Sequence, residues 1–153
     1  MAPKPATASA RKSTKRSGAS EIAPGVFVGG WNDAGDFDGV RICVLDEPPA
    51  EPIPGATHLP IYDEARDAVL VANLDRIATM VASAAAEQKP VLLFCGHGIR
   101  RGSLAAAWYL HRQDGVSLDD AYERVRAVRP KIETGAEWVG HWPPSEVPAR
   151  HRR

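Results

Sequence analysis

The chain has 153 residues, of which 44% are hydrophobic and 25% are charged, and its formal net charge is zero. These values are typical of one soluble globular domain with a core of its own. The two cysteines, Cys43 and Cys95, both lie in apolar surroundings, which argues against a disulfide-rich secreted scaffold and favours a reduced, cytoplasmic setting. We see no signal-peptide core and no apolar run long enough to suggest a membrane span.

The charge is unevenly distributed. Residues 1–20 carry five basic side chains and no acidic one, so residues 21–153 hold a net charge of −5. This first segment is rich in Ala, Ser, Thr and Pro and lacks large apolar side chains after Met1, which predicts a disordered tail. It could serve as a basic arm for an anionic partner such as nucleic acid or a membrane surface, although a solubilising terminus is the simpler interpretation. We expect one domain over residues 21–142, followed by a flexible tail over 143–153.

The first half of the domain reads as short strands and loops. "GVFVGG" at residues 25–30 predicts a strand, and the polar stretch 31–39 predicts a turn region. The β-branched run at residues 40–47 predicts a second strand, which a proline-rich loop follows. Residues 56–63 predict a short extended segment near an edge of the sheet, because Pro60 cannot donate to a central ladder.

The second half alternates helices with one strand. Residues 67–88 predict a helix of about five to six turns. The continuous apolar run at residues 91–95 predicts a strand buried on both faces. We expect a buried helix over 103–112, a capped helix from Ser117 that ends at Pro130, and a final helix over 134–142. The apolar positions of the first helix are Leu70, Leu74, Ile77, Val81 and Ala84. The pattern indicates an α/β fold, with a largely parallel sheet of four to five strands flanked by helices.

The stretch "VLLFCGHGIRRGS" at residues 91–103 has the composition of an anion-binding loop. Cys95 ends the predicted buried strand, and ligand sites in open α/β sheets lie outside the carboxyl ends of strands. Gly96 and Gly98 allow a tight loop whose amides turn inward, and the helix that follows adds free N–H donors and a partial positive charge. The same field favours a thiolate at Cys95, and Arg101 offers a planar fork to two phosphoryl oxygens.

The spacing Cys-x-x-Gly-x-x-Arg resembles the signature of the cysteine-dependent protein tyrosine phosphatase superfamily, and the chain looks most like its compact dual-specificity branch. Four further segments are similar to parts of those domains, and the resemblance covers about residues 21–142. "IAPGVFVGG" resembles their opening strand, "GVRICVLDE" the next core strand, "HLPIYDE" the general-acid segment, and "AYERVRAVRP" the helix after the catalytic one.

The resemblance implies a protein tyrosine phosphatase-like fold and a two-step hydrolysis of phosphomonoesters on proteins or other molecules. Cys95 would form a phosphocysteine intermediate, and Arg101 and the loop amides would hold the phosphoryl oxygens, with no metal or other cofactor. Asp63 matches the family's general acid, and Glu64 and Asp67 are the alternatives. The substrate-binding residues implied are Gly96, His97, Gly98, Ile99, Arg100, Gly102 and Ser103.

Two departures from the family pattern leave other functions open. Phe94 stands where the family usually has a histidine, and Gly102 stands where it usually has Ser or Thr. The chain could therefore be a phosphate-binding pseudophosphatase, and whether the neighbouring Ser103 replaces the missing hydroxyl is left open by the sequence. A third class, a sulfurtransferase or arsenate reductase, fits less well, since the former needs no Arg101 and the latter carries its loop near the N-terminus.

Other residues have both a structural and a functional interpretation. His97 and Arg100 make the loop basic, which is consistent with solvent-facing charges or with a substrate that carries several phosphates, such as a phosphoinositide or an RNA 5′ end. Cys43 is expected to be core packing or, as a minority hypothesis, the partner of Cys95 in a reversible disulfide. We expect Arg129 to pair with a loop carboxylate. The tryptophans Trp108, Trp138 and Trp142 are assigned to packing.

Overall fold

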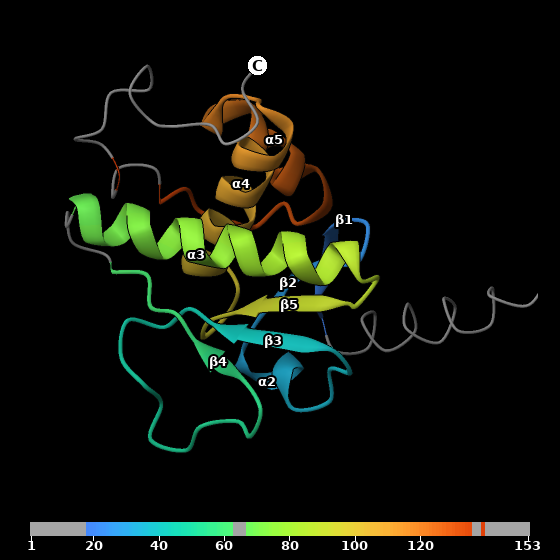
Figure 1. The fold of residues 1–153 in the computed structure, drawn as a ribbon, viewed down its shortest axis with the longest axis vertical. Helices are drawn as coiled ribbons and strands as arrows, with labels where there is room; N and C mark the ends of the chain where they lie inside the picture. The colour runs from blue at the N-terminus through green and yellow to red at the C-terminus, as the bar shows by residue number, and fades with distance from the viewer. Residues whose placement is uncertain (1–17, 63–66, 136–138, 140–153) are drawn as a thin grey trace, which may run out of the picture.

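The computed structural model describes residues 18–62, 67–135 and 139, and it places five strands in one sheet (Figure 1). The strand order is β1-β2-β5-β3-β4, with one antiparallel pair, β1 with β2, and three parallel pairs. The largely parallel α/β fold is confirmed. The strands are β1 Ser20–Ala23, β2 Val26–Gly29, β3 Val40–Cys43, β4 Thr57–His58 and β5 Val91–Phe94.

The central strand β5 brings the carboxyl ends of three strands to one edge of the sheet. Its four residues are all buried, as the continuous apolar run predicted. Phe94 at its end lies in register between Gly29 of β2 and Cys43 of β3. The chain leaves β5 at Cys95, so the predicted loop begins at the edge where ligands bind in this class of sheet.

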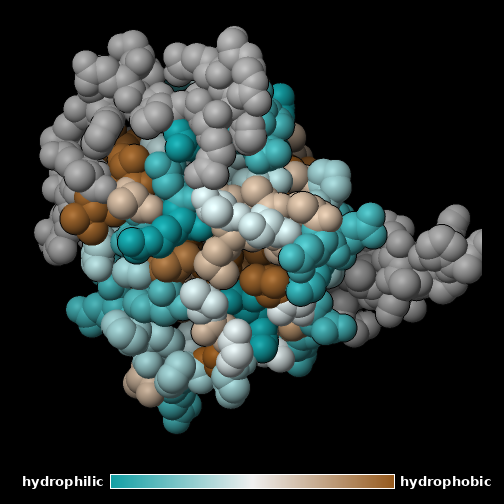
Figure 2. Space-filling model, viewed as in Figure 1, coloured by the Kyte–Doolittle hydropathy of each residue, from teal (hydrophilic) through white to brown (hydrophobic). Residues whose placement is uncertain are grey.

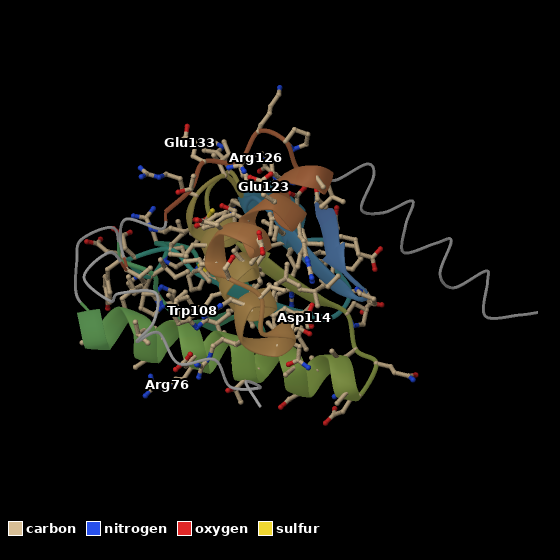
Figure 3. All side chains as sticks on the ribbon, turned by 90° about the horizontal axis from the view of Figure 1, so that it is seen from above. Arg76, Trp108, Asp114, Glu123, Arg126 and Glu133 are labelled. Carbon is tan, nitrogen blue, oxygen red and sulfur yellow. The ribbon has the colours of Figure 1, made fainter. Side chains whose placement is uncertain are left out.

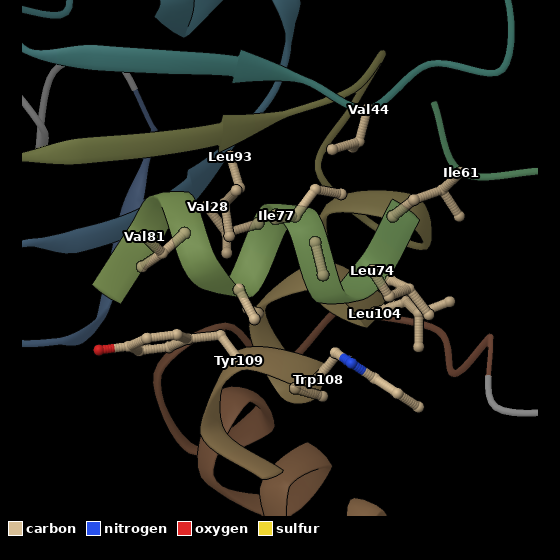
Figure 4. Close-up of a cluster of buried hydrophobic side chains, with 14 of the residues drawn as sticks. Val28, Val44, Ile61, Leu74, Ile77, Val81, Leu93, Leu104, Trp108 and Tyr109 are labelled. Atoms are coloured by element: carbon tan, nitrogen blue, oxygen red, sulfur yellow. The ribbon is translucent and has the colours of Figure 1, made fainter. Parts of the chain in front are cut away.

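The long helix α3 (Asp67–Ala86), which follows β4 in the chain, covers one face of the sheet together with α4 (Figures 1 and 4). Its predicted apolar positions are all buried, including Leu74 and Ile77, which are fully buried. Burial of each such side chain stabilises the fold by about 1.5–3 kcal/mol. By length and composition, residues 69–86 also satisfy the criteria for a membrane span, which the sequence analysis did not expect. The apolar face of this helix lies in the core instead.

The helices α4 (Arg101–Asp114) and α5 (Leu118–Val128) complete that layer. Gly115 ends α4 in the left-handed conformation, and the Ser117 side chain caps α5 by accepting a hydrogen bond from the Asp120 amide at 3.0 Å. Trp108 is fully buried, as expected, and its indole N–H donates to Asp75 Oδ1 of α3 at 2.9 Å.

The surface of the described residues carries few large apolar side chains. Only Val69 and Val128 are both large and exposed among them. Figure 2 shows apolar residues scattered among polar ones on the face that α3 occupies.

Several sequence predictions need correction. Ser20, predicted to be the last residue of the tail, is instead the first residue of β1, so the fold begins before residue 21. Residues 31–34 form a short helix, α2 (Trp31–Ala34), within the predicted turn region. The strand predicted over 40–47 ends at Cys43, and α4 begins two residues before its predicted start. Residues 1–17 and most of the predicted helix over 134–142 lie outside the described residues.

Candidate active site

The loop from Cys95 to Arg100 curls around the cysteine sulfur. The Gly98 amide donates a hydrogen bond to Cys95 Sγ at 3.2 Å. This contact requires Gly98 to adopt a φ of 70°, which glycine reaches without steric cost. Only 5% of the surface of Cys95 is exposed, so the residue is buried beneath the loop.

The loop rests on the turn between β2 and α2. The Trp31 amide donates to the Gly96 carbonyl at 3.0 Å. The two backbones approach so closely that a Cβ at Gly30 would lie 2.8 Å from the Gly96 oxygen. Asp33, which is buried, fixes this turn by accepting a hydrogen bond from the Gly30 amide at 2.7 Å. The Gly96 carbonyl is thus bound to this turn, while the Gly98 amide donates to the sulfur on the inner side of the loop.

Arg101 reaches back across the sheet edge from the first turn of α4. Its Nε donates to the Ile61 carbonyl at 2.9 Å, and its Nη2 lies 3.4 Å from Asp46 Oδ2. Ile61 is itself tied to the continuation of β3, through its amide and the Val44 carbonyl at 3.1 Å. The guanidinium is therefore anchored by the two segments that follow β3 and β4.

Arg129 holds the outer side of the loop. Its Nε donates to the Gly98 carbonyl at 2.9 Å and its Nη2 to the His97 carbonyl at 3.1 Å. Its Nη1 donates to the Gly18 carbonyl at 2.7 Å and to Ser20 Oγ at 2.9 Å. A loop carboxylate was the predicted partner of Arg129, but its hydrogen bonds go to backbone carbonyls and a hydroxyl. Burial lowers the pKa of Arg129, and the negative charges of Asp33 and Cys95 partly offset that effect.

Replacing Arg129 with methionine is expected to lower kcat/KM of any loop-dependent reaction about 10- to 100-fold, because the loop loses the contacts that orient its amides. The loss of these bonds should also lower the free energy of unfolding by about 1–3 kcal/mol. Arg126→Met is the matched control, since Arg126 pairs with exposed Glu123 on the same helix. Equal activity of the two variants would show that the Arg129 contacts do not position the loop.

Ser103 turns its hydroxyl toward backbone carbonyls rather than toward Cys95. Its Oγ lies 2.7 Å from the Ile99 oxygen and 3.0 Å from the Arg100 oxygen, and the residue is fully buried. A Cβ at Gly102, in contrast, would lie 3.7 Å from Cys95 Sγ. Position 102 is therefore the one from which a hydroxyl could reach the sulfur, and glycine supplies none.

The remaining predicted site residues are distributed around the loop. Gly96 and His97 are exposed, and Ile99 accepts a hydrogen bond through its carbonyl from the Glu133 amide at 3.0 Å. Phe94 is fully buried and packs edge-to-face on Trp31, with ring centroids 5.9 Å apart.

Asp63 and Glu64 lie outside the described residues, and so does the side chain of Asp67, the first residue of α3. The described chain reaches Tyr62, directly before Asp63.

Cys43 lies on the opposite face of the sheet from Cys95. It packs with Phe94 and Leu92, whereas Cys95 belongs to the core under α3 and α4. Burial raises the pKa of the Cys43 thiol, the Leu45 amide lowers it, and the nearby charge of Cys95 raises it. Both cysteines are free, and they belong to separate core clusters. The packing role is the one this geometry supports.

Asp46 as the partner of Arg101 was not predicted, and Arg129 was predicted to bind a loop carboxylate rather than the Gly98 and His97 carbonyls. Asp46 follows β3, and the rule that located Cys95 applies to it as well, because parallel strands end at the same edge. No sequence signal marks the Arg129 contacts, since they depend on how α5 packs beside β1.

Comparison with known proteins agrees with this geometry. Residues 54–141, more than half of the chain, match the family model of the dual specificity phosphatase catalytic domain, and this range includes both Cys95 and Arg101. The chain is 27% identical to mouse dual specificity phosphatase 28 over 80% of its length and 78% of that protein. It is 28% identical to human dual specificity protein phosphatase 12 over 77% of its length, but spans only 39% of that protein.

Solved structures share the fold. The crystal structure of human DUSP28 superimposes with a TM-score of 0.67 at 23% identity, covering 80% of this chain and 90% of the other. The structure of Tk-PTP in its active form gives a TM-score of 0.65 at 27% identity, covering 80% and 94%. With the loop, its arginine and the matching family model in place, the chain belongs to the dual specificity phosphatase catalytic-domain family, within the cysteine-dependent protein tyrosine phosphatase superfamily.

Proposed function

We propose that this protein hydrolyses phosphomonoesters on phosphorylated proteins through a phosphocysteine intermediate, without a metal ion. The observation that carries the proposal is the loop amide of Gly98 directed at Cys95 Sγ, at 3.2 Å, directly before the N-terminus of α4. A donor in this position stabilises negative charge on the sulfur, and the same loop can then receive the oxygens of a phosphate dianion.

In the first step, Cys95 Sγ attacks phosphorus and the bond between phosphorus and the ester oxygen breaks. The electron pair of that bond goes to the leaving oxygen, which takes a proton from a general acid. In the second step, water attacks phosphorus and gives a proton to the carboxylate that the general acid became, the S–P bond breaks, and inorganic phosphate and the cysteine thiolate are released. In this proposal, Arg101 and the loop amides stabilise the negative charge on the equatorial oxygens in both steps by charge-assisted hydrogen bonds.

We assign the general acid to Asp63. The support is its match to the family pattern and the attachment of the preceding segment, whose Ile61 carbonyl accepts a hydrogen bond from Arg101. Asp63→Asn is expected to lower kcat about 10²- to 10³-fold for an alkyl phosphate and much less for p-nitrophenyl phosphate, whose leaving group needs no proton. Glu64→Gln and Asp67→Asn are the matched controls. Equal loss with both substrates, or loss only in a control, would remove this assignment.

The direct test is hydrolysis of p-nitrophenyl phosphate by the wild type with EDTA present. We expect turnover that EDTA leaves unchanged and that vanadate inhibits competitively, because vanadate resembles the pentacoordinate phosphorus. Turnover that requires added metal would contradict the proposal.

A second candidate, a phosphate-binding module without turnover, is favoured by one observation. Position 102 faces the Cys95 sulfur and carries no hydroxyl, and Ser103 is engaged with carbonyls. If this candidate is right, the wild type binds vanadate without hydrolysing p-nitrophenyl phosphate, and Gly102→Ser gains activity. The added Cβ would lie 3.2 Å from Val28 Cγ1, a methyl group that needs to shift only slightly.

A further inference from the structure

An ion pair lies on the outer side of the phosphate-binding loop. Arg100 Nε is 3.9 Å from Glu133 Oε1, and the two side chains are 41% and 67% exposed. Glu133 is fixed there by its backbone, because its amide donates to the Ile99 carbonyl at 3.0 Å and its carbonyl accepts from Ser103 Oγ at 3.3 Å. A carboxylate is thus held beside the arginine that directly precedes Arg101.

In the proposed function, neither the Arg100 side chain nor the Glu133 side chain holds the first phosphate. That role belongs to the loop amides and Arg101, and Arg100 adds a second guanidinium next to Arg101 in the chain. At 3.9 Å this ion pair is long, and, although Arg100 Nε itself is buried, both side chains are partly exposed. Such a pair contributes little to stability, so an incoming anion can replace the carboxylate. A phosphate would gain more from the exchange, since a guanidinium binds its oxygens with charge-assisted hydrogen bonds.

We propose that Arg100 binds a second anionic group of the substrate, typically a second phosphate beside the transferred one, and that Glu133 competes with that group. This inference rests on the proposed function, because it assumes that the loop holds the first phosphate. Glu133 then sets how strongly the site prefers substrates with several phosphates over those with one.

The test compares the binding of inorganic phosphate and inorganic pyrophosphate by calorimetry, which does not require turnover. Glu133→Gln is expected to lower the Kd of pyrophosphate about three- to tenfold and that of phosphate less than about twofold, since the removed charge lies nearer the second group. Arg100→Gln is expected to raise the Kd of pyrophosphate selectively. In the double variant, the effect of Glu133→Gln should disappear, because it acts through Arg100.

Asp114→Asn is the matched control, because it removes the same charge from another exposed ion pair. Asp114 pairs with Arg124 at the far end of α4, about 21 Å along the helix from the loop, and Figure 3 shows it well separated from Glu133. For Asp114→Asn, the ratio of the pyrophosphate Kd to the phosphate Kd should equal that of the wild type.

The outcomes separate the two proposals. If the wild type binds neither anion, the phosphate-binding function itself falls. If it binds both and Glu133→Gln leaves the ratio of the Kd values unchanged, or Asp114→Asn shifts it equally, only the second-anion site is overturned. Melting temperatures are measured for all variants, and values close to that of the wild type are expected because the fold is retained.

Discussion

Cys95→Ser is expected to lower kcat for p-nitrophenyl phosphate by a factor on the order of 10⁴ or more, because a serine hydroxyl at this site is a far weaker nucleophile than a thiolate. The loop should still bind phosphate, since the Gly98 amide can donate to an oxygen as well as to the sulfur. Retained vanadate or phosphate binding in calorimetry therefore serves as the check on the fold.

Cys43→Ala provides the matched control for this variant. Cys43 is also buried, but it packs on the opposite face of the sheet. We expect near wild-type kcat and a stability loss of about 1–2 kcal/mol from the small cavity. Activity that survives Cys95→Ser, or that depends equally on Cys43, would show that another group performs the reaction.

Gly98→Ala is expected to lower kcat/KM about 100-fold or more and the free energy of unfolding by about 2–4 kcal/mol. Position 98 has a φ of 70°, where a side chain is strained. The added Cβ would also lie 2.6 Å from the Gly29 carbonyl oxygen and 2.8 Å from Arg129 Nη2. Because the Gly29 backbone cannot give way as a flexible side chain would, the loop itself must move. The Gly98 amide, which donates to Cys95 Sγ, moves with the loop.

Gly96→Ala separates this effect from the mere loss of a glycine. A Cβ at Gly96 would meet no atom within 4 Å. We expect kcat/KM within about threefold of the wild type and little change in melting temperature, since an exposed alanine in an unstrained position costs little. Comparable losses in both variants would show that the φ of Gly98 and its contact with Gly29 do not shape the site.

The sequence predicted best those elements whose signal is local. The strand β5 is a continuous apolar run, and α3 repeats its apolar side chains at helical spacing over five turns. The strand β1 was missed because it has four residues, is partly polar, and gains its stability from pairing with β2. The helix α2 has a single turn, which is too short to show a helical period.

The site residues likewise divide into those with a local sequence signal and those that depend on contacts between distant parts of the chain. Cys95, Gly98 and Arg101 lie within seven residues, so their spacing alone indicates an anion-binding loop. Arg129 contacts that loop from 31 residues away, through packing of α5 that the sequence does not encode locally. The tight approach of Gly30 to the loop likewise depends on parallel pairing of β2 with β5.

The most direct test of the central claim is a rapid-quench experiment on the wild type with excess p-nitrophenyl phosphate and EDTA. The protein is denatured with detergent at alkaline pH within the first turnover, because the S–P bond is hydrolysed in acid, and is then digested at alkaline pH and examined by mass spectrometry. We predict one phosphoryl group on the peptide that contains Cys95, and none on that peptide in Cys95→Ser. Steady turnover with no phosphoryl group on Cys95, or with the group on another residue, would contradict catalysis through this cysteine.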